Sequence, residues 1–176
     1  MELGVDFMNV EIKKATIENL EKIPKFGEFE IGKMNKNDLK FLPELIRQYY
    51  IENPEGSTNI EGMYHNFEKY QDSEFWHFFV MRHGKETMGY AEVFLHPSLF
   101  FDQKPYITIW WVRIENKYRN QGLGKKLIQY IEDFGREMGA DSCCLQAEVA
   151  NINAQKLYES LGYEKDMGYF KDLLRK

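Results

Sequence analysis

The sequence predicts an α/β domain built on a mixed sheet, and three observations indicate this fold class. Residues 106–114 form an apolar run rich in β-branched and aromatic side chains, which suit a largely buried strand. Residues 123–138 repeat apolar side chains at steps of three and four, so one face of a helix is apolar and the other polar. Another apolar run follows at 142–149. Because a helix separates the two strands, a right-handed crossover can place them parallel.

Composition sets broad limits on the class of protein. A chain of 176 residues suits one domain spanning residues 1–176. The net charge of −5 comes from both signs mixed along the chain, so we expect no nucleic-acid partner. An acidic surface would suit a cationic amine, although solubility alone is the more common cause. The N-terminus lacks a signal-peptide pattern and no apolar run reaches membrane-spanning length, so we expect a soluble, cytoplasmic protein that contacts no membrane.

Cysteine and histidine give no sign of a disulfide or a metal site. Cys143 and Cys144 are adjacent in an apolar run, and neighbours in a strand point to opposite faces, which makes them poor disulfide partners. We therefore expect reduced thiols in the core. The 4 histidines lack metal-ligand spacing, so we expect no metal.

The first half of the chain carries weaker patterns than the second. We expect a strand at 10–14, a short helix from 16 to near Pro24, a small strand at 28–31, a helix from 37 or 38 to about 49, a turn at 53–57 and a helix at 60–70. Runs at 75–82 and 87–95 then alternate as two antiparallel strands joined through Gly84.

The second half continues from the 106–114 strand and the 123–138 helix. Gly139 suits the end of that helix. After the 142–149 strand we expect a helix capped by Asn151 or Asn153 and closed by Gly162. Two short strands at 163–165 and 167–171 would complete the sheet.

The stretch 119–124, Arg-Asn-Gln-Gly-Leu-Gly, connects the apolar strand to the amphipathic helix. The first N–H groups of a helix have no partner within it and carry the positive end of its dipole. Glycine at 122 and 124 lets the backbone approach a phosphate, and Arg119 can add a charge-assisted contact. The sequence therefore predicts an anion-binding loop here, although a plain strand-to-helix connection is the simpler alternative.

Two motifs carry a resemblance to a known family. The spacing R-x-x-G-x-G at 119–124 is neither a dinucleotide fingerprint nor a P-loop. A second motif, N-x-x-A-x-x-x-Y-x-x-x-G-Y, runs from Asn151 to Tyr163. Together they resemble the GCN5-related N-acetyltransferase (GNAT) superfamily. That resemblance implies a mixed, mostly antiparallel sheet with a central splayed pair of parallel strands flanked by helices, and acetyl-CoA as cosubstrate.

The resemblance also implies roles for individual residues. The cofactor-binding positions would be Val112, Arg113, Ile114, Arg119, Asn120, Gln121, Gly122, Leu123, Gly124, Lys125, Asn151, Asn153 and Tyr158. The backbone N–H of Val112 would polarise the thioester carbonyl, and Tyr158 would donate a proton to the departing thiolate. Packing is the alternative role for Tyr158, and helix capping is the alternative role for Asn151.

The general base is less well defined. Some family members carry a glutamate where this chain has Thr108, and others carry one where it has Gln146. Glu148, two residues beyond Gln146 on the expected strand, and Glu92, in the preceding hairpin strand, are the candidates. Ordered water is a third route for the proton.

The sequence thus favours an acetyl-CoA-dependent N-acetyltransferase that acts on a primary amine of a small molecule or peptide by direct transfer in a ternary complex. The alternative is a non-catalytic acyl-CoA-binding sensor or regulatory module of the same fold. Acyl chain length, the identity of the amine and formation of a homodimer are left open.

Overall fold

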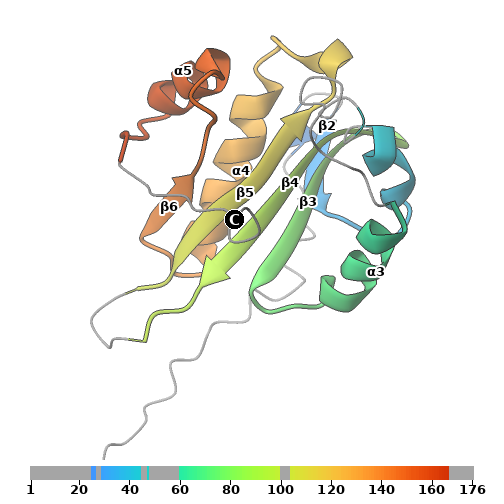
Figure 1. The fold of residues 1–176 in the computed structure, drawn as a ribbon, viewed down its shortest axis with the longest axis horizontal. Helices are drawn as coiled ribbons and strands as arrows, with labels where there is room; N and C mark the ends of the chain where they lie inside the picture. The colour runs from blue at the N-terminus through green and yellow to red at the C-terminus, as the bar shows by residue number, and fades with distance from the viewer. Residues whose placement is uncertain (1–24, 27–28, 45–46, 48–59, 100–103, 167–176) are drawn as a thin grey trace, which may run out of the picture. The chain divides into compact units, whose positions relative to one another are not determined.

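The computed structural model describes residues 25–26, 29–44, 47, 60–99 and 104–166. The chain divides into two compact units, residues 1–145 and 146–176. Within the described residues, the first unit contains a sheet with the strand order β1-β2-β3-β4-β5-β6 (Figure 1). The second unit contains helix α5, Ile152–Ser160.

The described part of the first unit combines strands, α-helices and 3-10 helices. Its elements are β1 (Lys25–Phe26), β2 (Phe29–Lys33), the 3-10 helix η1 (Leu39–Phe41), α3 (Ile60–Tyr70), β3 (Trp76–His83), β4 (Glu86–His96), β5 (Tyr106–Ile114), the 3-10 helix η2 (Asn116–Tyr118), α4 (Leu123–Glu137) and β6 (Ser142–Leu145). The strand pairs from β1 to β5 are antiparallel, and β5 pairs with β6 in parallel. The fold class predicted from the sequence, a mixed and mostly antiparallel sheet between helices, is confirmed.

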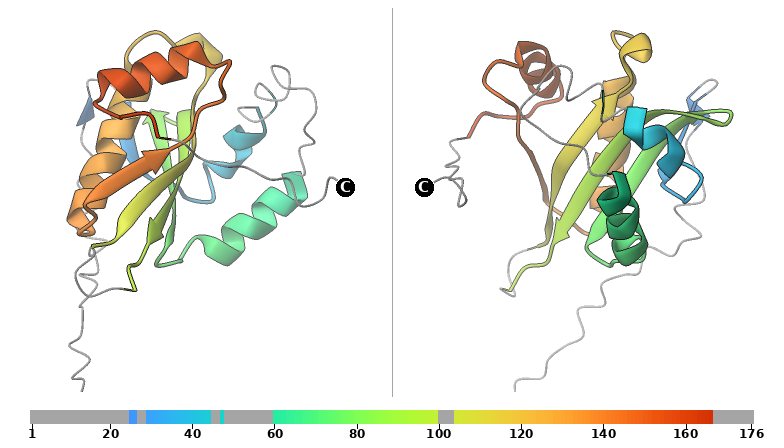
Figure 2. Two further views of the ribbon diagram at one scale, coloured as in Figure 1. Left: turned by 60° about the vertical axis from the view of Figure 1, so that its left-hand side comes forward. Right: turned by 45° about the vertical axis from the view of Figure 1, so that its right-hand side comes forward.

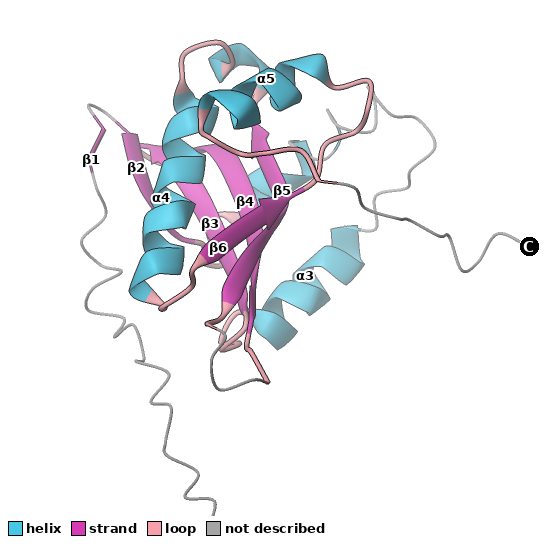
Figure 3. Cartoon of the chain, turned by 90° about the vertical axis from the view of Figure 1, so that its left-hand side faces the viewer, coloured by secondary structure: helices cyan, strands magenta, loops and turns pink. Residues whose placement is uncertain are grey.

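Helix α4 covers one face of the sheet, and α3 lies on the other (Figure 3). The apolar stripe of α4 is fully buried at Leu127, Ile128 and Ile131. Phe134 of the same helix meets Phe79 of β3 edge to face, with ring centroids 5.0 Å apart. A Cβ at Gly135 would lie 2.7 Å from Ile107 Cδ1, so glycine lets α4 lie close against β5.

A second core cluster lies on the opposite face, between the sheet and the segment that holds η1 and α3. It contains Met34, Leu39, Leu42, Phe67, Phe78 and Val80, with Met63, Trp76 and Tyr90 packed against it. A buried ion pair joins this segment to the sheet: the Arg82 guanidinium donates from Nε and Nη2 to both carboxylate oxygens of Asp38, at 2.8 and 2.5 Å. The same Nη2 donates to the Lys33 carbonyl at 2.8 Å. The pair therefore fixes the β2–η1 connection over β3.

Most elements of the described chain match the sequence predictions. The helix at 60–70 and the strand at 106–114 have the predicted bounds. The hairpin turns through Gly84 at a φ of 58°, and α4 ends before Gly139 at a φ of 79°. The η1 helix and the helical residues 42–44 and 47 lie in the helix predicted to begin at 37 or 38.

Three predictions in this part of the chain are wrong. The strand predicted at 142–149 ends at Leu145, and residues 163–165 form no strand. The thiols of Cys143 and Cys144 are half-buried and exposed, not in the core, because β6 is short. The elements predicted at 10–14, from 16 to near Pro24, at 53–57 and at 167–171 lie outside the described residues. Among the described helices, none has the length and apolar character needed to cross a membrane.

Replacing Arg82 with Met should strongly destabilise the protein, because it leaves the Asp38 carboxylate buried without its cation. Removing one partner of a buried pair typically costs about 3–5 kcal/mol of the free energy of unfolding, which urea denaturation would measure. Lys36→Met is the matched control, since Lys36 pairs with Glu68 at the surface, where both side chains are more than half exposed. Equal effects of the two variants would contradict a structural role for the buried pair.

Candidate functional site

The parallel strands β5 and β6 pair over only part of β5. Their register runs from Tyr106 opposite Ser142 to Ile109 opposite Leu145. Strand β5 continues to Ile114, so its last residues extend beyond β6 (Figure 2). Within the described residues no strand pairs with this side of residues 110–114. We call this stretch the open edge of β5.

A β-bulge in β5 marks the start of the open edge. Glu92 of β4 lies opposite Trp111, whereas the next residue, Val93, lies opposite Ile109. Trp110 is therefore an extra residue in β5, and its side chain is 61% exposed. Bulges interrupt the hydrogen-bond ladder and redirect side chains, and they are common next to functional sites.

Hydrogen-bond alternation sets which backbone groups face the open edge. The Glu115 N–H donates to the Met88 carbonyl at 2.8 Å, which makes these two a hydrogen-bonded pair. In an antiparallel ladder hydrogen-bonded and non-hydrogen-bonded pairs alternate. The next pair, Ile114 opposite Gly89, and the pair of Val112 are therefore non-hydrogen-bonded. The main chains of Val112 and Ile114 thus point away from β4 and toward the open edge.

Arg113 has the opposite orientation. The same alternation directs its main chain toward β4, opposite Tyr90. Of the three strand residues that the sequence predicted to bind cofactor, Val112 and Ile114 present backbone groups to the open edge, and Arg113 does not.

The loop 119–124 connects the end of η2 to α4. Asn120 and Gly122 both have positive φ angles, 63° and 75°. Gly122 is the N-cap of α4, and its carbonyl accepts from the Lys126 N–H at 3.2 Å. The N–H groups of residues 123–125 therefore have no partner within the helix and carry the positive end of its dipole.

The surroundings of this loop leave room for an anion. A Cβ at Gly122 would meet no heavy atom of the described chain within 4 Å. Gln121 and Lys125 are exposed, whereas Leu123 is buried. Successive backbone N–H groups in such a turn form a concave site for phosphate oxygens. The loop therefore fits the anion site that the sequence predicted.

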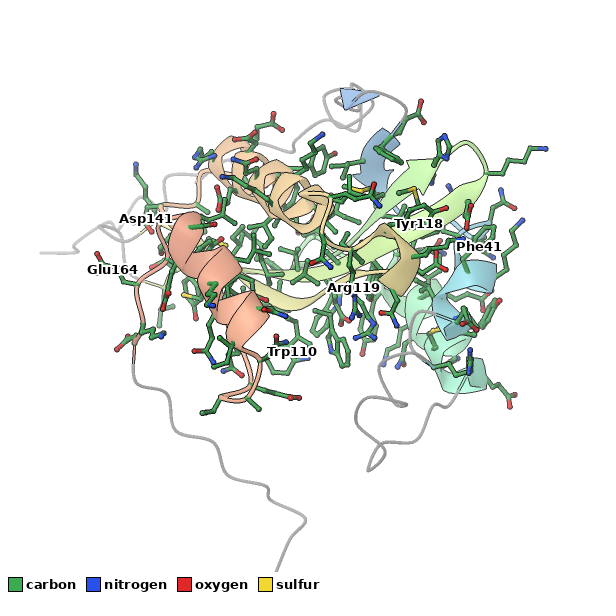
Figure 4. The ribbon with its side chains drawn as sticks, turned by 90° about the horizontal axis from the view of Figure 1, so that it is seen from above. Phe41, Trp110, Tyr118, Arg119, Asp141 and Glu164 are labelled. Atoms are coloured by element: carbon green, nitrogen blue, oxygen red, sulfur yellow. The ribbon has the colours of Figure 1, made fainter. Side chains whose placement is uncertain are left out.

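Side chains on the approach to the loop hold it against the sheet. Arg119 Nε donates to the Ile114 carbonyl at 3.0 Å, which ties the loop to the end of β5 (Figure 4). Glu86, at the start of β4, accepts from Lys117 and from the Tyr118 hydroxyl, the latter at 3.0 Å. The hydrogen bond from Lys117 lowers the pKa of the Glu86 carboxyl. The structure thus gives Arg119 a role within the fold, and its contact with phosphate stays a prediction.

Glu92 lies opposite the bulge, on the face of the sheet away from α4. Its carboxylate accepts a hydrogen bond from the Tyr90 hydroxyl at 3.0 Å. Burial raises the pKa of Glu92, and the hydrogen bond from Tyr90 opposes the shift. A carboxyl with a raised pKa is better matched to proton transfer near neutral pH.

A histidine that sequence reasoning set aside lies on the same face. His96 Nε2 is 2.9 Å from the hydroxyl of Thr108, the position at which some members of the resembled family carry a glutamate. The imidazole stacks on Tyr106, with ring centroids 4.2 Å apart, and burial lowers the pKa of His96. The register between β4 and β5 is the signal that could have identified His96. It places His96 opposite Tyr106, and Tyr106 lies on the same face of β5 as Thr108, two residues farther along.

The second unit holds the other predicted site residues. Burial raises the pKa of Tyr158, which is half-buried in α5. Asn151 Oδ1 accepts from the Ala154 N–H at 3.1 Å, so Asn151 is the helix cap. Asn153, in the first turn, is exposed.

Glu148 is not where the sequence placed it. It lies after the end of β6, in an exposed turn in which its carbonyl accepts from the Asn151 N–H at 2.9 Å. The Gln155 side chain donates to the carbonyls of Glu148 and Val149, at 3.2 and 2.8 Å. These bonds stabilise a turn, so Glu148 does not share a strand face with Gln146. In the part of the chain that the structure describes, no three His, Cys, Asp or Glu side chains gather where they could hold a metal ion.

Known proteins resemble this chain at the level of sequence. A human protein, N-alpha-acetyltransferase 30, is 30% identical over 95 residues, which cover 53% of this chain and 25% of that protein. The protein of the same name in Xenopus laevis is matched over 33% of its length. The chain therefore spans a third or less of the length of these relatives.

Solved structures share the fold. A transcriptional regulator from Bacillus halodurans C-125 superposes with a TM-score of 0.75 at 20% identity, covering 82% of this chain and 98% of that one. The aminoglycoside N-acetyltransferase AAC(6')-Iy in complex with CoA gives 0.70 at 18% identity, covering 88% and 99%. The model of the Acetyltransferase (GNAT) family matches residues 41–163, which is more than half of the chain. The chain belongs to the acetyltransferase (GNAT) family.

Proposed function

We propose that the protein is an acetyl-CoA-dependent N-acetyltransferase that transfers an acetyl group directly to a primary amine of a small molecule or peptide. The observation that carries this proposal is that the open edge of β5, toward which the Val112 main chain points, leads into the loop before α4, where the N–H groups of residues 123–125 have no partner within the helix. The family membership supports acyl transfer, and the structure of AAC(6')-Iy, a GNAT-fold neighbour, contains CoA.

The anion loop would bind the pyrophosphate of acetyl-CoA. The N–H groups of residues 123–125 donate to phosphate oxygens, and Arg119, Asn120, Gln121 and Lys125 surround that position. Ile114 and Val112 would hold the rest of the cosubstrate through their main chains. Asn151 and Asn153 are further proposed contacts with it.

The transfer itself requires polarisation, a neutral amine and a protonated leaving group. The Val112 N–H would donate to the carbonyl oxygen as the N–C bond forms and negative charge develops there. The C–S bond then breaks, and the Tyr158 hydroxyl would give its proton to the departing thiolate. Because burial raises the pKa of Tyr158, this hydroxyl stays protonated at neutral pH.

Glu92 is our choice for the general base that removes a proton from the ammonium. It lies opposite the bulge at the start of the open edge, and its buried position raises its pKa. Glu148 is less suited, because it is exposed in a turn. Water is the remaining route. A screen of polyamines, aminoglycosides, aralkylamines and peptides for CoA release would identify the acceptor amine.

A non-catalytic acyl-CoA sensor is the second candidate. It is favoured by the absence of a glutamate at Thr108 and Gln146, and the Bacillus halodurans neighbour bears the name of a transcriptional regulator. Binding of acetyl-CoA without turnover on any amine would support it. A cytoplasmic location and the assignment of residues 1–176 to one domain remain proposals in either case.

Gly122→Val should abolish most of the affinity for CoA, because the added side chain occupies the approach to the N–H groups of α4. Gly139→Val is the matched control, since Gly139 ends the same helix at a φ of 79°, against 75° for Gly122, and it too has no heavy atom within 4 Å of an added Cβ. Titration calorimetry with CoA measures both. Equal affinities in the two folded variants would remove the loop as the phosphate site.

Tyr158→Phe should lower kcat by about 10²–10⁴-fold while leaving the Kd for acetyl-CoA nearly unchanged, because it deletes a proton donor and keeps the ring. Steady-state kinetics on the screened amine measure the first quantity, and calorimetry measures the second. Tyr163→Phe serves as control, since the Tyr163 ring is 6.2 Å from that of Tyr158. Wild-type turnover in Tyr158→Phe would exclude the tyrosine from the mechanism.

Glu92→Gln should lower kcat/KM most near neutral pH and recover in part at high pH, where free amine is available without a base. In the wild type the base works deprotonated, so activity falls as the pH drops through the raised pKa of Glu92. Glu148→Gln should leave the pH–rate profile in place. A shift with Glu148→Gln alone would transfer the role to Glu148, and no shift in either variant would assign deprotonation to water.

A further inference from the structure

We propose that Trp110, Trp111 and Glu92 form a recognition site for an organic ammonium group attached to an apolar body, and that this site selects the acceptor. The inference rests on the proposed N-acetyltransferase function and adds the class of amine. It commits to a small aralkylamine or alkylamine rather than to a polyhydroxylated amine.

The bulge places two consecutive tryptophans on one face of the sheet. Ile107 faces α4, since it contacts the position of a Gly135 side chain, and Ile109 follows by alternation, so residue 110 points to the other face. Counting from the far end, Ile114 and Val112 share a face with Gly89 and Ala91, so Trp111 points away from α4 with its partner Glu92. Figure 4 shows Trp110 on the side of β5 away from α4. Without the extra residue, one of the two indoles would lie under α4.

The surroundings of Glu92 are aromatic on every side. Phe78 lies opposite it on β3, and Tyr90 and Phe94 precede and follow it on the same face of β4. Trp76, opposite Phe94, completes the set with an edge-to-face contact at 5.1 Å. Among the described residues no Lys or Arg forms an ion pair with Glu92.

Charge and exposure indicate which ligand would fit. A carboxylate among indole and phenyl rings attracts an ammonium group both by its charge and through cation–π contacts. Arg113 lies one pair farther along β5, opposite Tyr90, and it is the cation of β5 on this face. Helix α3 and η1 cover the part of the face over Phe78, whereas Trp110 is 61% exposed. The exposed indole would therefore contact the apolar body next to the ammonium.

The site also lies where an acceptor is needed. Trp111 immediately precedes Val112, whose N–H faces the open edge and is the proposed donor to the reacting carbonyl. An ammonium held by Glu92 is thus near the start of the open edge, where the proposed transfer occurs.

The test compares phenethylamine with glucosamine, two primary amines whose bodies differ, at saturating acetyl-CoA. Trp110→Leu should raise the KM for phenethylamine about 3- to 10-fold, more than it lowers kcat, because the indole loses its contact with the phenyl ring next to the ammonium. Trp110→Phe should recover most of the effect, and the KM for glucosamine should change little. Tyr64→Leu is the control, as Tyr64 is an exposed aromatic residue on α3. An unchanged KM for phenethylamine in Trp110→Leu would overturn the proposal while the N-acetyltransferase function stands.

A second readout needs no turnover. The 3 tryptophans of the chain are Trp76, Trp110 and Trp111, so selectively excited tryptophan fluorescence reports on this face. Choline should change the tryptophan emission of the wild type, whereas its uncharged isostere 3,3-dimethylbutan-1-ol should not. Glu92→Gln should weaken the response to choline at least several-fold. If no amine is acetylated but choline binds in this way, the proposed function fails and the ammonium site stands. Equal responses to choline and its isostere would overturn the site.

Discussion

The candidate site depends on the point at which β5 and β6 stop pairing. A parallel ladder continues only while both strands stay in register, and here it ends at Ile109 and Leu145, where β5 gains Trp110 as an extra residue. Past that point the hydrogen-bond ladder between β5 and β4 continues. The backbone groups of Val112 and Ile114 therefore face the side of β5 opposite to β4. The open edge thus begins where the pairing with β6 ends, and the bulge at the same point places two indoles on one face.

The two faces of the sheet are covered by different elements. Helix α4 buries an aliphatic and aromatic stripe against one face, and this packing positions its N-terminus beside the carboxyl end of β5. The Arg119 bond to the Ile114 carbonyl and the Glu86 contacts with η2 fix the loop between them. The opposite face would carry the proposed chemistry: Glu92 accepts a hydrogen bond there from Tyr90 among aromatic rings, under partial cover from α3. Cofactor and acceptor would therefore meet at the open edge from separate sides.

Much of this arrangement could be predicted from the sequence. Strong local patterns placed the β3–β4 hairpin, β5 and α4, and a weaker pattern placed α3. The glycine at 122 marked a position with positive φ. The end of β6 could not be predicted, because Gln146 to Glu148 continue the alternation and only a turn made by Gln155 and Asn151 interrupts it. The bulge could not be predicted from the sequence either, because an extra residue in a strand does not change the residue types that indicate the strand. For the same reason sequence reasoning passed over Trp110 and His96, whose neighbours depend on the register between strands.

The most direct test is amide hydrogen exchange of the full chain with and without acetyl-CoA. If the open edge of β5 and the N-terminus of α4 together hold the cosubstrate, exchange should slow at Val112 and at residues 123–125, whereas amides in the ladder between β3 and β4 should be unaffected. Binding of acetyl-CoA that leaves Val112 and residues 123–125 as accessible as before would contradict this assignment.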